Sequence, residues 1–321
     1  MKAKYNPGII ANDEGLKNLC KKYSIKFNNN SIKKIYNFRN LIFSNPFLNK
    51  NIFGVILHED DFLNKEGIDF IKNLKKNKIK IGMKFDSGRK LESKKKLEKI
   101  TFGFKEIRKK ILIYKKFNCS FAKWKVEFNV YNSSLSDKNI KKNIYTLIKF
   151  ITICQKHNIL PMIESDLTRN SKYSLSTAIK LTEKIYKLLN SELKKKNIYI
   201  KILFKTNIIY PGKGSKLNHK ISATKTKTMI SEYLGKNIKN IFFLSGGEKD
   251  NKVIKTIKIL QKEERKYYSF AFGRGFFYKV DNFFISQNIN KIFKICNQKI
   301  NNYKNLNLWK KKKVYVAMAG D

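Results

Sequence analysis

Residues 198–205 have the sequence Ile-Tyr-Ile-Lys-Ile-Leu-Phe-Lys, an almost continuous apolar run that ends at Lys205. Apolar residues without polar alternation are typical of a strand in a parallel sheet, where both faces of the strand are buried. Seven further runs of this kind, rich in β-branched and aromatic residues, occur along the chain. Together they predict eight strands, at residues 8–12, 53–57, 79–83, 121–126, 159–163, 198–204, 241–244 and 268–272.

Segments with helical periodicity separate these strands. Apolar residues at the i, i+3, i+4, i+7 spacing predict helices that bury one face. A closed barrel of eight βα units needs about 250 residues. We therefore expect an α/β fold, a (β/α)8 TIM barrel, as a single domain over residues 1–321 with a short C-terminal tail around the lysines at 310–313. The helical stripes occur within residues 32–41, 104–111, 144–151, 178–188 and 253–260.

The formal net charge is +46, from 70 basic and 24 acidic residues. Nucleic-acid-binding proteins can have such a charge, but here the lysines are spread over the whole chain together with many Asn and Ile residues. This mixture is typical of an AT-rich coding sequence, so we interpret the charge as compositional and expect no specific nucleic-acid partner. In such a chain the scarce carboxylates and the 15 glycines are more informative by their placement than the lysines.

Cysteine and histidine residues are few and widely spaced. Their spacing matches neither a zinc site nor a disulfide framework, which favours a reducing, cytoplasmic location and no bound metal. There is no run of roughly 18 or more apolar residues and no apolar stretch near the start, so we expect neither a membrane span nor a secretory signal. The cysteines are Cys20, Cys119, Cys154 and Cys296, and the histidines are His58, His157 and His219.

Polar residues stand at or just after the ends of the predicted strands. In TIM barrels the reacting groups come from these ends, although strand ends also collect polar residues because they meet solvent. Several of the scarce carboxylates and a Gly-Gly pair are found there. In chain order the groups are Asp13-Glu14, His58-Glu59-Asp60-Asp61, Lys84-Phe85-Asp86, Lys123-Trp124-Lys125, Glu164 with Asp166, Lys205, Ser245-Gly246-Gly247 and Gly273-Arg274.

Four of these groups indicate a chemistry that has three parts. An amine at the end of an apolar run, such as Lys205, has a lowered pKa because it loses hydration, and this makes it a nucleophile. A carboxylic acid beside it, such as Glu164, can move protons. The segments Ser245-Gly246-Gly247 and Gly273-Arg274 can bind a phosphate through backbone N–H groups and a guanidinium. The alternatives are a solvated lysine, a simple turn and a structural ion pair, so the residues themselves predict only a phosphate-binding barrel enzyme.

The same groups occur within motifs that resemble, in order and over nearly the whole chain, those of the class I (Schiff-base-forming) fructose-1,6-bisphosphate aldolases. The resemblance implies a metal-independent lyase, an aldehyde-lyase of glycolysis that needs no cofactor. It further implies a cytoplasmic homo-oligomer, often a tetramer, whose partner is a phosphorylated sugar. The motifs are Gly8-Ile9-Ile10-Ala11-Asn12-Asp13-Glu14, Gly54-Val55-Ile56-Leu57, Gly82-Met83-Lys84-Phe85-Asp86-Ser87-Gly88, Phe121-Ala122-Lys123-Trp124-Lys125, Asn158-Ile159-Leu160-Pro161-Met162-Ile163-Glu164, Leu203-Phe204-Lys205-Thr206-Asn207, Phe243-Leu244-Ser245-Gly246-Gly247 and Ser269-Phe270-Ala271-Phe272-Gly273-Arg274.

The resemblance implies catalytic roles for four residues. Lys205 is expected to form an imine with the substrate ketone, and Glu164 to act as acid and base while the carbinolamine forms and loses water. Asp13 is expected to take the C4 hydroxyl proton as the C3–C4 bond breaks, and Lys123 to supply positive charge around the imine. The residues implied in substrate binding are Lys84, Lys125, Ser245, Gly246, Gly247, Gly273 and Arg274.

Some positions depart from the family pattern. Lys125 replaces an arginine, Asp166 a glutamate and Thr206 a proline, and Lys21 or Lys22 stands in for an arginine of the first helix. Two other functions stay open. One is a Schiff-base aldolase of the same fold that prefers another phosphorylated sugar, such as sedoheptulose bisphosphate or fructose 1-phosphate. The other is a catalytically weakened aldolase-like protein that binds polyanions through its basic surface.

Overall fold

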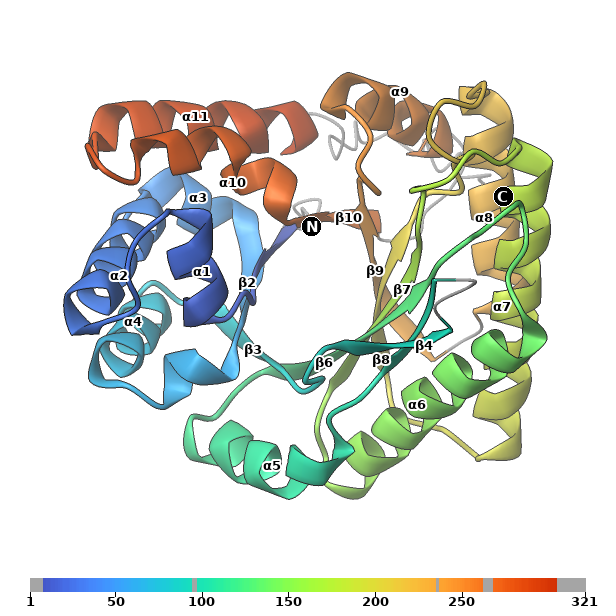
Figure 1. Cartoon of the computed structure of the whole chain (residues 1–321), viewed down its shortest axis with the longest axis horizontal. Helices are drawn as coiled ribbons and strands as arrows, with labels where there is room; N and C mark the ends of the chain where they lie inside the picture. Colours follow the sequence, from blue (N-terminus) through green and yellow to red (C-terminus); the bar gives the residue numbers. More distant parts are fainter. Residues whose placement is uncertain (1–7, 94–96, 235–236, 262–267, 305–321) are drawn as a thin grey trace, which may run out of the picture.

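The computed structural model describes residues 8–93, 97–234, 237–261 and 268–304. In this part of the chain, eight parallel strands close into a barrel that helices surround (Figure 1). The single-domain TIM barrel predicted from the sequence is therefore confirmed. The lysines at 310–313 and the rest of the predicted tail lie outside the described residues.

The barrel is continuous around its circumference. Each barrel strand pairs in parallel with the barrel strands that precede and follow it along the chain. The last barrel strand also pairs with the first, which closes the barrel. The strands are β1 Gly8–Asn12, β2 Ile52–Leu57, β3 Lys80–Lys84, β6 Phe121–Phe128, β7 Pro161–Leu167, β8 Ile202–Asn207, β9 Ile238–Leu244 and β10 Tyr268–Phe272.

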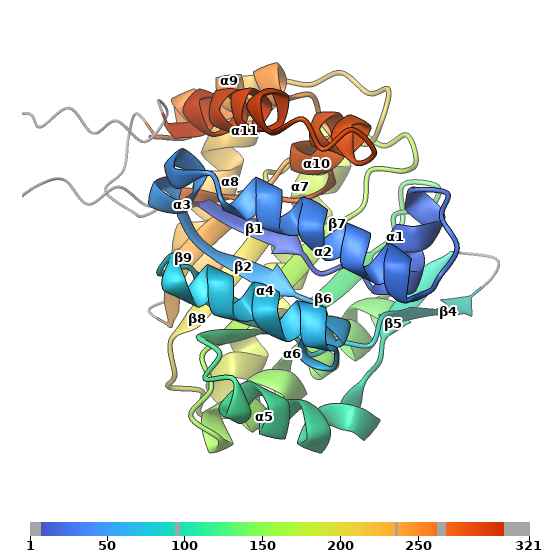
Figure 2. The same cartoon turned by 90° about the vertical axis from the view of Figure 1, so that its left-hand side faces the viewer.

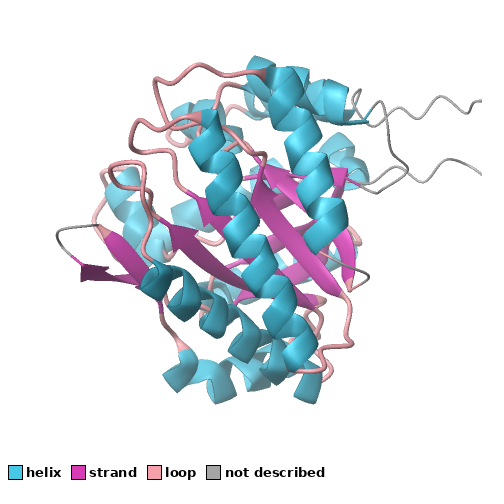
Figure 3. Ribbon diagram, turned by 90° about the vertical axis from the view of Figure 1, so that its right-hand side faces the viewer, coloured by secondary structure: helices cyan, strands magenta, loops and turns pink. Residues whose placement is uncertain are grey.

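Helices cover the outer face of the barrel on all sides. Two of them, α2 and α4, pack side by side over β1 and β2 (Figure 2), and longer helices cross in front of the strands on the opposite side (Figure 3). None of the described helices combines the length and apolarity needed to cross a membrane. The helices are α1 Leu16–Lys22, α2 Asn29–Phe43, α3 Pro46–Asn51, η1 Glu59–Phe62, α4 Lys65–Lys76, η2 Phe104–Glu106, α5 Ile107–Lys116, α6 Asp137–Lys156, α7 Leu175–Lys195, α8 His219–Tyr233, α9 Asp250–Gln261, α10 Arg274–Val280, η3 Asp281–Phe283 and α11 Ile289–Lys304.

Local sequence explains where many helices begin. At the start of α6, the Ser136 hydroxyl accepts a hydrogen bond from the backbone N–H of Asn139, and Ser174 caps α7 in the same way. Such caps satisfy donors that the first helical turn leaves free and are typically worth about 1 kcal/mol. Asparagine side chains cap four further helices, through Asn28, Asn45, Asn64 and Asn218.

Several strands extend beyond the predicted apolar runs, and β7 and β8 continue furthest past the predicted ends. The run at 159–163 corresponds to β7, which starts at Pro161 and continues to Leu167, and the run at 198–204 corresponds to β8, which starts at Ile202 and ends at Asn207. Glu164 and Lys205 therefore lie within strands, and the expectation that strands end there was wrong. The apolar runs stop early because the upper part of the barrel interior is polar, so a change in polarity there does not mark a strand end.

A hairpin outside the barrel was not predicted. The strands β4 Arg89–Ser93 and β5 Glu98–Thr101 pair antiparallel between β3 and α5, and they extend away from the barrel (Figure 2). Their sequence is rich in charged and polar residues and has no clear apolar alternation. The usual signal for a half-buried strand is therefore absent.

Apolar side chains fill the lower part of the barrel interior. They form a separate buried cluster, apart from the core between strands and helices. Side chains alternate between the two faces of a strand, so Phe121, Met162 and Leu203 lie one step below Lys123, Glu164 and Lys205 on the same inner face. We call this cluster the barrel floor; its buried members are Ile9, Ile56, Phe121, Met162, Leu203 and Phe242.

Gly82 provides room for the largest members of the floor. A Cβ atom at this position would lie 2.1 Å from Cε2 of Phe121, whose side chain is fully buried. No side chain fits at 82 unless the Phe121 ring moves, and the ring is enclosed by other floor residues. Glycine at this position is therefore a packing requirement.

Gly82→Ala should lower the free energy of unfolding by about 1–3 kcal/mol, the usual cost of overpacking a core. The matched control is Gly275→Ala, because a Cβ there meets nothing within 4 Å. In α10 that substitution should be neutral or stabilising, since alanine favours helices. Equilibrium urea unfolding measures both, and equal changes in the two variants would contradict the packing argument.

Candidate active site

The register of the sheet brings three predicted site residues together. Glu164 of β7 is the ladder partner of Lys205 of β8 and of Lys125 of β6. Ladder partners project from the same face, so their side chains lie side by side in the barrel. The Lys205 Nζ atom lies 2.8 Å from Glu164 Oε2, and the Lys125 Nζ atom lies 3.2 Å from Glu164 Oε1. Glu164 and Lys205 are 3% and 6% exposed.

Lys123 connects this group to the first strand. Its Nζ atom lies 3.0 Å from Glu164 Oε2 and donates a hydrogen bond of 2.7 Å to Oδ2 of Asp13, the residue that follows β1. Lys123 is 3% exposed. A buried ammonium group thus bridges two carboxylates that are 151 residues apart in the sequence.

Two more aspartates surround the lysines. Lys125 Nζ lies 2.5 Å from Oδ2 of Asp166, and its backbone N–H donates to Oδ2 of Asp86 at 3.2 Å. Lys84, the last residue of β3, has its Nζ atom 3.7 Å from Oδ1 of Asp86. Lys84 is therefore joined to the network through Asp86, at the same rim of the barrel.

The charges shift the pKa of the central amine. Burial lowers the pKa of the Lys205 ammonium below its usual value, and the positive charges of Lys123 and Lys125 act in the same direction. The carboxylates of Glu164 and Asp13 oppose these effects but do not cancel them. A neutral amine is consequently more accessible at Lys205 than at an ordinary lysine, which is the condition for nucleophilic attack.

The neighbouring groups keep their charges. Burial disfavours the charged form of Glu164, but Lys123, Lys125 and Lys205 hold its pKa well below the usual range. The pKa of Asp13 is lowered in the same way, against burial, by Lys123, Lys205 and Lys84. Conversely, the carboxylates raise the pKa of Lys123 and of Lys125 despite their burial. Of the three lysines that surround Glu164, Lys205 is the one whose pKa is lowered.

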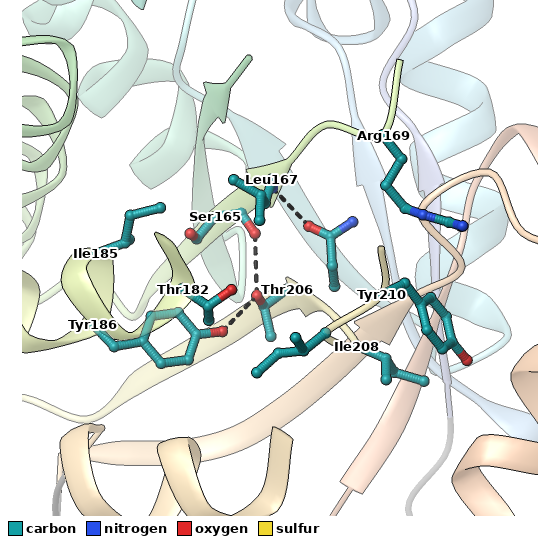
Figure 4. A pocket seen from close by; sticks show the side chains of 11 residues that line it. Ser165, Leu167, Arg169, Thr182, Ile185, Tyr186, Thr206, Ile208 and Tyr210 are labelled. Atoms are coloured by element: carbon teal, nitrogen blue, oxygen red, sulfur yellow. Dashed lines mark hydrogen bonds between the residues drawn. The ribbon is translucent and has the colours of Figure 1, made fainter. Parts of the chain in front are cut away.

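A relay of two hydrogen bonds that the sequence did not predict lies next to Lys205; it consists of Tyr186, Thr206 and the backbone of Ser165. Thr206 donates to the backbone carbonyl of Ser165 at 3.1 Å, so the Tyr186 hydroxyl must be the donor in its 2.8 Å contact with Thr206. Figure 4 shows the three residues beside a cavity of about 20 Å³ between the strands and α7. The relay ties β7 to β8 directly beside Glu164 and Lys205. Threonine in place of the family's proline is the one sequence signal that could have indicated it.

The glycine segments lie at the same rim, on neighbouring strands. Ser245, Gly246 and Gly247 follow β9, and both glycines have positive φ, 57° and 80°, a conformation that favours glycine. Gly273 follows β10, the ladder neighbour of β9, and caps α10, whose first residue is Arg274. Turns of this kind can direct several N–H groups at an anion.

The structure therefore unites all four predicted catalytic residues in one network and places the glycine segments at the same rim. Lys21 and Lys22, the two candidates to replace the family's arginine in the first helix, are not equivalent. The Nζ atom of Lys22 is paired with Oδ2 of Asp281 at 2.5 Å. Within the described ranges, no three His, Cys, Asp or Glu side chains gather as metal ligands would.

Comparison with known proteins agrees with this geometry. Residues 3–290 match the family described as fructose-bisphosphate aldolase class-I. The chain belongs to this family. The match confirms the resemblance inferred from the motifs. The class I fructose-bisphosphate aldolases are lyases that act on phosphorylated sugars.

Individual aldolases are similar over most of their length. The chain is 31% identical to the fructose-bisphosphate aldolase of Encephalitozoon cuniculi over 278 residues, which are 84% of this chain and 81% of that protein. It is 28% identical to fructose-bisphosphate aldolase 2 of Caenorhabditis elegans, over 84% of this chain and 75% of the relative. A solved structure of the Plasmodium falciparum aldolase has the same fold, with a TM-score of 0.85, 21% identity and coverage of 95% of this chain and 91% of that one.

Replacing the neighbours of Lys205 should move its pKa in opposite directions. Lys123→Met removes a charge that lowers this pKa, so the amine should react at higher pH; Glu164→Gln removes a charge that raises it, so the amine should react at lower pH. Only the neutral amine is a nucleophile. The rate of reductive alkylation of Lys205 against pH, followed by peptide mass spectrometry, measures the shift.

The exposed Lys138 of α6 offers a matched control, since Lys138→Met removes the same charge from a side chain that is not among those named as shifting the pKa of Lys205. Its profile should coincide with that of the parent. A shift in the same direction in both site variants would show that these two charges do not set the pKa of Lys205.

Proposed function

We propose that this protein is a class I aldolase that cleaves fructose 1,6-bisphosphate reversibly into dihydroxyacetone phosphate and glyceraldehyde 3-phosphate, through a Schiff base on Lys205. The observation that carries the proposal is the Lys205 amine, buried, with a lowered pKa and 2.8 Å from a carboxylate. Family membership and the match to the sixth-strand motif support it. The remaining roles are those that the resemblance to the family implies, and the positions of the neighbouring residues support them.

Imine formation begins with the pair of Lys205 and Glu164. The carboxylate takes the proton from Lys205, and the neutral amine adds to the C2 carbonyl of the sugar to form a carbinolamine. Glu164 then returns the proton to the leaving hydroxyl, water departs, and an iminium remains. Lys123 and Lys125 supply positive charge that stabilises the oxygen while it carries negative charge.

Cleavage needs a base on the other side of the substrate. The Asp13 carboxylate, held by Lys123 at 2.7 Å, accepts the C4 hydroxyl proton. As the C4 carbonyl forms, the C3–C4 bond breaks and its electron pair moves into the iminium, giving an enamine and the free aldehyde. Protonation of the enamine at C3 and hydrolysis of the imine release the ketone product. The iminium is the electron sink, so the proposed reaction needs neither metal nor cofactor.

The glycine segments are proposed to bind a substrate phosphate. Ser245, Gly246, Gly247 and Gly273 offer hydroxyl and N–H donors, and Arg274 a guanidinium. Lys84 and Lys125 are proposed to contact the sugar oxygens near the scissile bond. By its resemblance to the family we also propose a cytoplasmic homo-oligomer, a tetramer, which light scattering of the purified protein tests.

Borohydride should trap the imine. Incubation with fructose 1,6-bisphosphate and borohydride should inactivate the protein and attach the reduced sugar to Lys205, as peptide mapping can show. Lys205→Met should give no adduct, and EDTA should leave cleavage unchanged. An adduct on another lysine, or activity that chelation abolishes and zinc restores, would overturn the mechanism. Comparing kcat/KM with sedoheptulose bisphosphate and fructose 1-phosphate tests the preferred sugar.

Arg274→Ala should raise KM for the bisphosphate about tenfold or more. A charge-assisted hydrogen bond is worth about 1.5–3 kcal/mol, and about 1.4 kcal/mol corresponds to a factor of ten. Trapping of unphosphorylated dihydroxyacetone should change little, because that ligand has no phosphate. A change in KM below about twofold would show that Arg274 does not bind phosphate, and an equal loss in both reactions would indicate a structural role.

A further inference from the structure

Arg169 is a largely buried arginine close to the proposed phosphate turn. It lies two residues beyond β7, and its side chain is 11% exposed. The guanidinium lies over the ring of Tyr210, with its central carbon 5.2 Å from the ring centroid (Figure 4), and its Nε–H donates to the backbone carbonyl of Pro211 at 2.6 Å. The side chain thus links the loop after β7 to the loop after β8.

The same guanidinium pairs with a carboxylate next to the turn. The Arg169 Nη2 atom lies 3.0 Å from Oε2 of Glu248, the residue that directly follows Gly247. Glu248 is also largely buried, with 12% of its side chain exposed. Its other oxygen lies 3.4 Å from Nζ of Lys252, a half-exposed side chain one helical turn further on. The backbone N–H of Lys249 also donates to this second oxygen, at 3.1 Å. Of the two positive charges paired with Glu248, Arg169 is the better buried and the closer.

Backbone hydrogen bonds hold the loop from which the Arg169 side chain extends. The Lys213 N–H donates to the carbonyl of Arg169 at 3.1 Å, and the Gly212 N–H donates to the carbonyl of Tyr173 at 3.0 Å. A Cβ at Gly212 would lie 2.1 Å from the carbonyl oxygen of Ser171, so the two loops are in close contact. The loops after β7 and β8 form one unit, from which Arg169 reaches the turn after β9.

The carboxylate of Glu248 has a consequence for any phosphate bound at Ser245-Gly246-Gly247. A carboxylate one residue from the turn repels a phosphate unless a positive charge is paired with it. Arginine suits this task, because its planar fork can bind the Pro211 carbonyl and the Glu248 carboxylate at once, whereas a lysine offers a single ammonium. Arg169 also passes beside the turn itself, since a Cβ atom added at Gly246 would lie 3.6 Å from its Cδ.

We propose that Arg169 is a positioning residue for phosphate affinity, which keeps the carboxylate of Glu248 paired and directed away from the phosphate turn. The proposal rests on the proposed function, because it assumes that the turn binds a phosphate of the substrate. It goes beyond that function in assigning an indirect, electrostatic role to a pair of residues that the family motifs do not include. Arg169 contacts Glu248 and the loops, and it acts on the ligand through them.

Three variants of the full chain test the charge argument. Arg169→Met leaves Glu248 without its buried partner and should raise KM for fructose 1,6-bisphosphate about tenfold, with a much smaller fall in kcat. Glu248→Gln keeps an acceptor for Arg169 and removes the repelling charge, so KM should stay within about twofold of the parent or fall. The double variant Arg169→Met with Glu248→Gln should recover most of the affinity lost in Arg169→Met.

Two controls separate this effect from damage to the fold. Arg108→Met removes an exposed arginine from α5 and should change nothing. Borohydride trapping of dihydroxyacetone on Lys205, which uses no phosphate, should proceed at the parent rate in Arg169→Met. If trapping falls as much as bisphosphate turnover, Arg169 is only structural and the proposal is wrong.

Some values of KM in these variants would contradict the proposal. KM within about twofold of the parent in Arg169→Met, or a double variant as weak as Arg169→Met, would contradict charge pairing as the cause. A tenfold rise of KM in Glu248→Gln would show that the carboxylate itself is needed. Failure of the proposed function looks different, because then the parent protein gives no adduct on Lys205 with either ligand.

Discussion

The carboxylate of Glu164 lies within 3.2 Å of three ammonium groups, with Lys205 and Lys123 at one oxygen and Lys125 at the other. Removing such charges from water is costly, and only close pairing offsets the cost. Asp13 and Asp166 complete the pairing, since each accepts from one of the same lysines. Asp86 and Lys84 join the same network, so four carboxylates and four lysine side chains meet at this rim, and each constrains the position of the others.

Packing on the outside of the barrel secures this arrangement. In β6, Lys123 and Lys125 face inward, so Trp124 between them faces the helices. There its ring stacks on Phe104 at 4.3 Å and on Phe150 at 5.5 Å between ring centroids. A shift of the strand by one residue would put the indole among the charges and the lysines among the aromatic rings. The aromatic contacts therefore fix which side chains enter the site.

Much of the fold could be predicted because barrel strands differ sharply from helices in apolar pattern. The strands β1 and β10 have the predicted bounds, since polar residues follow them where the strands end. For β7 and β8 the same reasoning failed, because Glu164 and Lys205 point into a polar interior while the backbone continues in the ladder. The hairpin of β4 and β5 has no comparable signal, as it lies outside the barrel and buries few apolar side chains.

Only part of the candidate site could be predicted from the sequence, because the composition of the chain obscures the functional lysines. Lysine is so frequent in this chain that position alone could not distinguish Lys205 from a solvated lysine, and the motif resemblance supplied the distinction. Arg169 was overlooked, although the chain has only six arginines among its 70 basic residues. In a lysine-rich sequence, an arginine is the cation whose position is informative. Its pairing with Glu248 depends on loops that meet only in the folded chain.

Because the barrel floor closes the lower part of the barrel, ligands reach and leave the site at its upper rim. Phe121, Met162, Leu203 and their neighbours close the barrel directly beneath the charged residues, so a ligand that reaches Lys205 enters and leaves past the rim. In the proposed cleavage, the fragment still bonded to Lys205 lies deeper than the fragment set free. In that proposed reaction the free aldehyde departs first in the cleavage direction and arrives last in the synthetic direction, because the other fragment is held by its bond to Lys205 and the floor closes the barrel beneath it.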